Sequence, residues 1–333
     1  MDKIRWAIVG TGYIANEFAR GMHEVGDAEL AAVVSRSPER GQAFAKSHGG
    51  GAVYADLREM LGAEKPDVVY VAIPNDLHFE AIMTALEAGA NVLSEKPMVD
   101  NAGQLDAVLG KAAEKDLFLM EGMWTRCFPA VVRARQWIRE GRIGRPLTVR
   151  ASFDIKPAIE DWQPWKGGIA HAAGALRDVG IYSLAMADLA FGREPERITT
   201  AMRSNGEVDH CFRMLMDYGE GRTALVGGAF DQVGDPEAEM VGELGRIVIG
   251  PLFWKPDTAA LELNDGSKEI FRQPYPASGF QYEIMAVQEC LAGGKKQCPH
   301  FTWEETVRIA GIIERTRKEW GIWYEADKEA KQA

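Results

Sequence analysis

The chain opens with a continuous apolar run over residues 4–9, which is followed by a glycine-containing turn. From Tyr13 to Met22 the apolar residues then recur every three or four positions. A continuous apolar run is typical of a buried parallel strand, whereas the longer spacing indicates an amphipathic helix. The pattern therefore predicts a strand, a tight turn and a helix at the start of the chain.

The same alternation continues through the first third of the sequence. Further strands are predicted at residues 30–34, 52–54, 67–73, 91–94 and 118–122, with a helix at 79–88. Strands that alternate with helices imply right-handed crossovers and a parallel sheet.

The pattern changes after Gly144-Arg145-Pro146, because strands now follow one another without helices between them. They are predicted at residues 147–153, 196–203, 211–217, 223–230, 239–243, 246–249, 259–263 and 268–272, and two packing helices follow at 280–292 and 302–320. Turns at Tyr218-Gly219-Glu220-Gly221 and Asn264-Asp265-Gly266-Ser267 favour antiparallel hairpins. We therefore expect an α/β plus α+β protein: a Rossmann domain at 1–123, then a domain at 124–333 built on an open, predominantly antiparallel sheet.

Composition excludes several classes of protein. The 333 residues carry a net charge of −11, which argues against nucleic acid as a partner, and no apolar run is long enough to span a membrane. The four cysteines form no Cys-x-x-Cys pair and the histidines are dispersed, so we expect no metal site and a reducing compartment. Because the first strand begins at residue 4, we expect no signal peptide and a cytoplasmic protein.

The first turn has the spacing of a dinucleotide-binding site, Gly10-Thr11-Gly12-Tyr13-Ile14-Ala15. Gly10 permits the tight turn, Gly12 lets the backbone approach a pyrophosphate, and Ala15 allows close packing of helix and strand. The backbone of Thr11, Tyr13 and Ile14 is expected to face the phosphates at the start of the helix.

The end of the second strand favours NADP over NAD. NAD-specific sites place an acidic residue there for the ribose 2′-hydroxyl, but this chain has Ser35 and Arg36, with Arg40 one turn later. Arginine suits a 2′-phosphate.

Polar residues also follow two later strands, as Pro74-Asn75-Asp76-Leu77-His78 and Glu95-Lys96-Pro97. Open α/β sheets bind their ligands at this edge. Together with the glycine turn and Ala85-Leu86-Glu87-Ala88-Gly89, these segments resemble the Gfo/Idh/MocA oxidoreductases. The resemblance implies that Lys96 is the active-site cation, that a cis peptide precedes Pro97, and that Glu95 and Pro97 shape the site. It also implies that Pro74, Asn75 and His78 lie near the nicotinamide ribose.

A second motif, Gly174 to Tyr182, resembles the same family and places Asp178 and Tyr182 on one helix face. Tyrosine at 182, together with Glu121 to Arg126, is most similar to the branch of dimeric dihydrodiol dehydrogenases, NADP-xylose dehydrogenases and glucose–fructose oxidoreductases. In that branch the tyrosine is the acid–base residue. An ammonium nearby favours the phenolate of a tyrosine, so Lys96 and Tyr182 make chemical sense as a pair, and Asp178 is expected to orient the lysine or to bind a sugar hydroxyl.

The resemblance also implies several residues around the substrate, and aromatic faces suit the C–H faces of sugars. They are Trp124, Arg126, Phe153, Trp162, His171, Trp254 and Phe280, with Trp165 expected at the cofactor.

These features predict NADP-dependent hydride transfer to or from a sugar or cyclic diol, and the resemblance implies a dimer through the open sheet. Two alternatives remain open. One is a glycosidase that uses a tightly held NAD transiently, and the other is a non-catalytic NADP sensor with a protein partner.

Overall fold

The structure is a computed structural model, and it describes residues 3–156 and 168–329. By its packing the chain divides into two compact units. The first comprises Met1–Trp124 and Tyr275–Trp303, and the second comprises Thr125–Pro274 and Glu304–Ala333.

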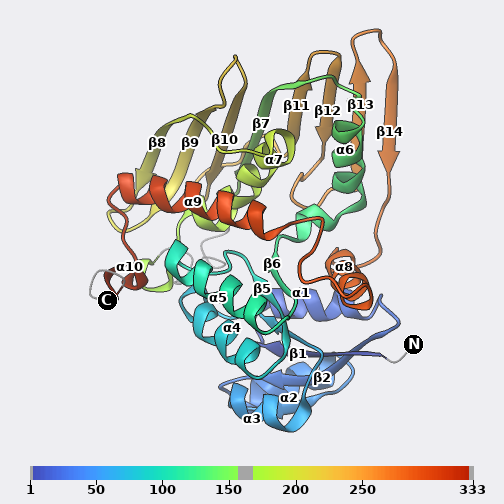
Figure 1. Ribbon diagram of the computed structural model, residues 1–333, viewed down its shortest axis with the longest axis vertical. Coiled ribbons are helices and arrows are strands. Elements are labelled where there is room, and N and C mark those ends of the chain that lie inside the picture. Colours follow the sequence, from blue (N-terminus) through green and yellow to red (C-terminus); the bar gives the residue numbers. More distant parts are fainter. Residues whose placement is uncertain (1–2, 157–167, 330–333) are drawn as a thin grey trace. The chain divides into compact units, whose positions relative to one another are not determined.

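The first unit is built on a six-stranded parallel sheet with the order β3-β2-β1-β4-β5-β6. Its strands are β1 (Ile4–Val9), β2 (Ala28–Val34), β3 (Ala52–Tyr54), β4 (Val68–Val71), β5 (Asn91–Glu95) and β6 (Leu119–Gly122). Its helices are α1 (Tyr13–Met22), α2 (Pro38–Ser47), α3 (Leu57–Glu64), α4 (His78–Glu87), α5 (Ala102–Glu114) and α8 (Gln281–Ala292) (Figure 1). This strand order is that of a Rossmann fold, which confirms the predicted class of the first domain.

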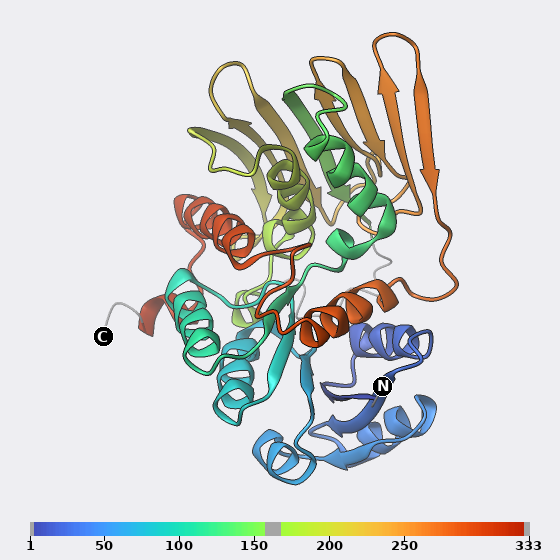
Figure 2. The same cartoon turned by 45° about the vertical axis from the view of Figure 1, so that its right-hand side comes forward.

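The second unit is built on an eight-stranded sheet with the order β14-β13-β12-β11-β7-β10-β9-β8, in which only β7 and β10 pair in parallel. Its strands are β7 (Pro146–Asp154), β8 (Arg197–Ser204), β9 (Asp209–Asp217), β10 (Thr223–Ala229), β11 (Ala238–Gly242), β12 (Gly245–Ile249), β13 (Thr258–Leu263) and β14 (Lys268–Arg272). Helices α6 (Pro129–Arg139) and α7 (Ile181–Phe191) pack on one face of this sheet, and α9 (Trp303–Glu319) and α10 (Glu325–Glu329) follow (Figure 2). The predominantly antiparallel second domain is thus also confirmed.

The other face of this sheet carries charge pairs and two exposed leucines. Leu215 on β9 and Leu225 on β10 lie directly opposite each other, and their side chains are 43% and 48% exposed. Beside them, ion pairs connect five neighbouring strands through Arg150, Glu239, Arg246, Glu262 and Lys268. The helices therefore bury one face of the sheet and leave the other to solvent.

Our sequence-based division at 123/124 places all later residues in the second domain, and the structure differs for Tyr275–Trp303. This segment packs in the first unit because it completes the edge of the parallel sheet. The Leu119 N–H donates to the carbonyl of Lys296 (3.1 Å), and the indole N–H of Trp303 donates to the carbonyl of Leu119 (2.8 Å). A side chain at Gly21 of α1 would meet the backbone nitrogen of Gln281 at 2.9 Å, so α1 and α8 are in close contact.

None of the helices in residues 3–156 and 168–329 is long and apolar enough to cross a membrane.

Candidate active site

The two glycines of the first turn have different roles. Gly10 has a φ of +109°, and a Cβ there would lie 2.2 Å from the carbonyl oxygen of Ala72. Gly12 caps α1 at an ordinary φ of −76°, and nothing lies within 4 Å of the position of its Cβ. Gly10 is therefore required by the fold, whereas Gly12 leaves open space at the positive end of a helix, which fits a dinucleotide pyrophosphate.

The side chain of Asn16, which the sequence did not single out, binds the backbone of this turn. Its side-chain amide donates to the carbonyl of Gly12 (2.8 Å), and its oxygen lies 2.9 Å from Nε2 of His48. Tyr13 and Ile14 are exposed at the start of α1, and Ala15 is fully buried against the sheet.

Arg36 lies in the loop after β2 and Arg40 lies in the first turn of α2. Arg36 and Arg40 are exposed, and Arg36 forms no ion pair or hydrogen bond with the other described residues. Ser35 is buried and donates to the carbonyl of Ser37 (3.0 Å), which fixes the loop. One carboxylate also lies here, because Glu39 accepts a hydrogen bond from the Ser37 hydroxyl (2.8 Å).

Lys96 follows β5 and is half-buried, and its peptide bond to Pro97 is cis, as the resemblance implied. The backbone is fixed on both sides of this lysine. The carboxylate of Glu95 accepts hydrogen bonds from the Tyr70 hydroxyl (2.6 Å) and from the Lys96 N–H (3.3 Å). One residue past Pro97, the Met98 N–H donates to the buried carboxylate of Glu121 (2.8 Å).

His78 is more deeply buried than its neighbours Pro74 and Asn75. We placed it beside the nicotinamide ribose with Pro74 and Asn75, both of which are half-buried, but His78 itself is 0% exposed. Its ring nitrogens lie 3.0 Å from the carbonyl oxygen of Pro97 and 2.8 Å from that of Ile73. His78 is the first residue of α4, and its ring lies between Ile73, after β4, and Pro97, after β5.

The first unit also contains a buried acid, Glu283, that the sequence did not single out. Glu283 on α8 is fully buried, and neither carboxylate oxygen has a hydrogen-bond partner in the described part of the chain. Burial raises the pKa of Glu283 well above its ordinary value, and the negative charge of Glu95 raises it further. Burial therefore favours the protonated form of this carboxyl.

In the first unit, Trp124 and Phe280 stack with ring centroids 4.4 Å apart. Phe280 is buried and also packs edge-on against Phe18 of α1 (5.9 Å). Both residues were expected at the substrate, and the structure brings them into contact.

In the second unit, three of the expected residues come together from three segments. Phe153 of β7 stacks on Trp254 at 3.7 Å between ring centroids, and it lies 5.4 Å from the ring of Tyr182 at the start of α7. Tyr182 is 8% exposed. The hydroxyl of Thr125 donates to the carbonyl of Trp254 (2.5 Å) and fixes its backbone.

Asp178 lies on a π-helical turn, Leu176–Gly180, rather than on the α-helix that we expected, and α7 begins only at Ile181. Such turns are frequent at functional sites. The turn is anchored by Asp209 on β9, whose carboxylate accepts a hydrogen bond from the Leu176 N–H (2.6 Å). A Cβ at Gly174 (φ +141°) would lie 2.3 Å from an oxygen of Asp209, which explains the glycine. Burial raises the pKa of Asp209 to about 6.

Arg126, which we expected at the substrate, is 2% exposed and lies in an ion-pair network. Its guanidinium contacts Asp188 of α7 and Glu305 of α9, each at 3.2 Å. Glu305 also binds Arg135, and Asp188 also binds Arg308. Buried charge requires such partners, and the network that contains Arg126 connects α6, α7 and α9 of the second unit.

The remaining expected residues are distributed as follows. His171 is half-buried on a short 3₁₀ turn, Ile169–His171. Trp162 and Trp165 lie outside the described residues.

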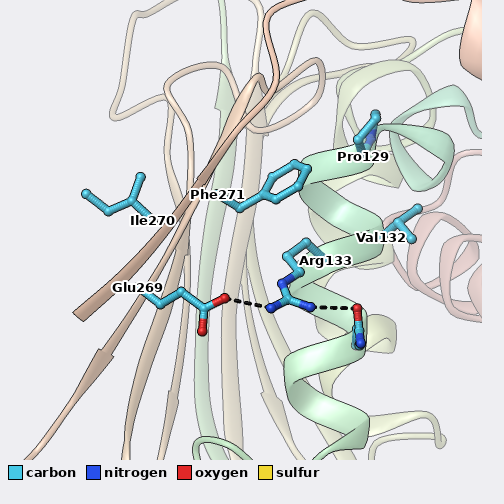
Figure 3. Close-up of a pocket in the computed structure, with 7 residues that line it drawn as sticks. Pro129, Val132, Arg133, Glu269, Ile270 and Phe271 are labelled. Carbon is cyan, nitrogen blue, oxygen red and sulfur yellow. Dashed lines mark hydrogen bonds and ion pairs between the residues drawn. The ribbon is translucent and has the colours of Figure 1, made fainter. Parts of the chain in front are cut away.

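A groove between α6 and β14 contains none of the expected site residues. It is lined by Pro129, Val132, Arg133, Gln136, Glu269, Ile270 and Phe271. An ion pair between Arg133 and Glu269 (2.6 Å) crosses it (Figure 3). We do not assign the active site to this groove.

Comparison with known proteins agrees with this geometry. Residues 4–123 match the oxidoreductase family with an NAD-binding Rossmann fold, GFO_IDH_MocA, and residues 131–248 match the GFO/IDH/MocA C-terminal domain. The trans-1,2-dihydrobenzene-1,2-diol dehydrogenase of Macaca fuscata fuscata is 31% identical over 98% of this chain and 99% of its own length.

Two solved structures are similar over nearly the whole chain. The aldose-aldose oxidoreductase from Caulobacter crescentus has a TM-score of 0.84 and 25% identity, covering 95% of this chain and 97% of its own. KijD10, a 3-ketoreductase from Actinomadura kijaniata in complex with NADP and TDP-benzene, has a TM-score of 0.82 and 26% identity, covering 95% and 98%. From the matched domains and the full-length similarity, the chain belongs to the Gfo/Idh/MocA family of NAD(P)-dependent oxidoreductases.

Proposed function

We propose that this oxidoreductase transfers a hydride between NADP and a secondary alcohol, or the matching carbonyl, of a sugar or cyclic diol. The observation that carries the proposal is the anchored position of Lys96, in the same unit as a glycine turn that is open at Gly12. A bound nicotinamide supplies the hydride donor or acceptor, and the protein supplies orientation and proton transfer.

The cofactor would be held by the first unit. The open side of Gly12 and the first amides of α1 suit the pyrophosphate, and Thr11, Tyr13 and Ile14 surround it. Arg36, which has no partner among the described residues, is available for the 2′-phosphate, with Arg40 and Ser35 beside it. Pro74, Asn75, Glu95 and Pro97 complete the nicotinamide end.

Proton transfer is assigned to Tyr182, with Lys96 as its electrostatic partner. During oxidation the Tyr182 phenolate would take the proton of the substrate alcohol and become the phenol, and during reduction the phenol would give its proton to the carbonyl oxygen and become the phenolate. The ammonium of Lys96 stabilises negative charge on the phenol oxygen and on the substrate oxygen. Asp178, half-buried one turn before Tyr182, would orient the lysine or bind a substrate hydroxyl.

The substrate class follows from the aromatic cluster and from the relatives. Phe153 and Trp254 offer flat apolar faces next to Tyr182, which suit the C–H faces of a ring. Trp124, Phe280 and His171 are the other described candidates. The dehydrogenase and the aldose-aldose oxidoreductase named above act, by their names, on a cyclic diol and on aldoses.

The oligomer is proposed to be a dimer formed through the open face of the large sheet. Leu215 of β9 and Leu225 of β10 are exposed apolar residues on this face, and the ion pairs of Glu239, Arg246 and Glu262 lie on strands of the same sheet.

The test is a substrate panel of aldoses, deoxyketoses and cyclic diols, with nicotinamide absorbance followed in both directions and with both NADP and NAD. The proposal expects turnover of at least one ring substrate and a preference for NADP. Cleavage of aryl glycosides with no net change in cofactor absorbance would instead indicate a glycosidase.

A further inference from the structure

His78 makes an unusual pair of contacts in the first unit. The ring is fully buried, Nδ1 lies 3.0 Å from the carbonyl oxygen of Pro97, and Nε2 lies 2.8 Å from the carbonyl oxygen of Ile73. Both distances are those of ordinary hydrogen bonds.

The chemistry of these two partners determines the protonation of the ring. A carbonyl oxygen only accepts hydrogen bonds, so each ring nitrogen must donate. A neutral imidazole carries one N–H and would leave the lone pair of its other nitrogen facing a carbonyl oxygen, inside the protein. Only the imidazolium makes both contacts as hydrogen bonds.

The two carbonyls belong to the two loops that flank the proposed nicotinamide site. Ile73 follows β4, next to Ala72, whose carbonyl oxygen lies against Gly10 of the dinucleotide turn. Pro97 directly follows Lys96. His78 is therefore the side chain through which the loop behind the glycine turn is connected to the lysine segment.

This contact completes the anchoring of Lys96. Glu95 holds the lysine's own N–H on one side, and Glu121 holds the N–H of Met98 on the other. The Pro97 carbonyl between them is held by His78. Without His78 the carbonyl would lose a buried partner and the turn would be free to shift.

We propose that His78 is a cationic positioning residue whose doubly protonated ring binds the carbonyl oxygens of Ile73 and Pro97 and so fixes the backbone that carries Lys96. The effect on catalysis rests on the proposed role of Lys96, whereas the protonation state of the ring does not.

The protonation is tested on the unmodified protein. Long-range ¹H–¹⁵N correlation spectra of ¹⁵N-histidine-labelled protein at pH 7 resolve the six histidines, and the His78 signals are identified by their loss in His78→Gln. The proposal expects two nitrogens of the protonated type with nearly equal shifts. One nitrogen of the unprotonated, pyridine-like type would overturn it, whatever the enzyme's activity.

The positioning role is tested with His78→Phe, which keeps a ring without donors, and His78→Gln, which restores an N–H donor. We expect kcat to fall by ~10-fold to ~100-fold in His78→Phe and less in His78→Gln, with the dissociation constant of NADPH changed by less than ~3-fold. His23→Gln, at an exposed position, is the matched control. Equal kcat in His78→Phe and the parent protein would overturn the role, and so would parallel losses of kcat and NADPH binding. If the parent protein shows no turnover, the NMR result still decides the state of His78.

Discussion

The ring of Phe153 lies 5.4 Å from the ring of Tyr182 and is tilted by 60° relative to it. Phe153 belongs to β7 and Tyr182 to the first turn of α7, so the contact joins the central strand of the large sheet to the helix that covers it. Phe153 also stacks on Trp254, which lies in the loop after β12. The orientation of the proposed acid–base residue therefore depends on an aromatic stack drawn from three segments.

Removal of the Trp254 ring should weaken substrate binding. In Trp254→Ala we expect KM for a ring substrate to rise by about 10-fold, because an aromatic contact contributes ~1 kcal/mol beyond its buried area. NADPH affinity should not change. Steady-state kinetics check this, with Val233→Ala at a highly exposed position as the control. An unchanged KM would remove Trp254 from the proposed substrate site.

The two glycines of the first turn should respond differently to substitution. Gly12→Val should fold with nearly unchanged thermal stability, since its Cβ meets nothing and its φ is ordinary, but it should bind NADPH ~100-fold less tightly. Gly10→Ala should lose more than ~2 kcal/mol of unfolding free energy, because its Cβ would overlap the Ala72 carbonyl at a positive φ. Fluorescence titration with NADPH and thermal unfolding measure both. Full NADPH affinity in Gly12→Val would place the pyrophosphate elsewhere.

Cofactor choice should depend on Arg36. Arg36→Glu replaces an exposed guanidinium with a carboxylate, so we expect NADP affinity to fall by ~100-fold or more while NAD affinity changes by less than ~3-fold. Arg58→Glu makes the same charge change at another exposed position of the first unit and is the control. Equal affinities of the unmodified protein for NADP and NAD would contradict the assignment before any substitution is made.

Asp209 should make stability depend on pH. Burial raises its pKa from 3.8 to about 6, so its contribution is fully present below pH 3.8 and is lost as the pH rises through about 6. The full shift corresponds to roughly 3 kcal/mol, of which about 2 kcal/mol is lost between pH 4 and 7. Asp209→Asn keeps an acceptor for the Leu176 N–H and should remove this dependence, as measured by urea unfolding at several pH values. Asp235→Asn, at an exposed position, should retain it. The same pH dependence in Asp209→Asn would show that another group is responsible.

Local signals were sufficient for much of this fold. The β1–turn–α1 segment, the strands of both sheets and the N-cap of α3 at Asp56 are set by apolar periodicity, glycines and capping residues close in sequence. The cis peptide before Pro97 followed from the resemblance and not from any local rule.

The features that were missed depend on contacts between distant residues. Tyr275–Trp303 joins the first unit through hydrogen bonds to β6, which no pattern within the segment encodes. The burial of Arg126 and Glu305 depends on an ion-pair network that includes their mutual contact, 179 positions apart in sequence. The contacts of the His78 ring with the carbonyl oxygens of Pro97 and Ile73 are likewise not encoded in its motif.

The central claim is that Tyr182 transfers the proton and that the ammonium of Lys96 stabilises negative charge on the phenol oxygen. Because NADP binding is assigned to other residues, Tyr182→Phe and Lys96→Met should each fold normally and bind NADPH within ~3-fold of the parent protein, while kcat falls by ~10²-fold to ~10⁴-fold. The measurement is single-turnover hydride transfer, followed by nicotinamide absorbance with a substrate identified in the panel. The account predicts that both variants lose this step while retaining NADPH binding. Near-normal transfer in either variant would contradict it.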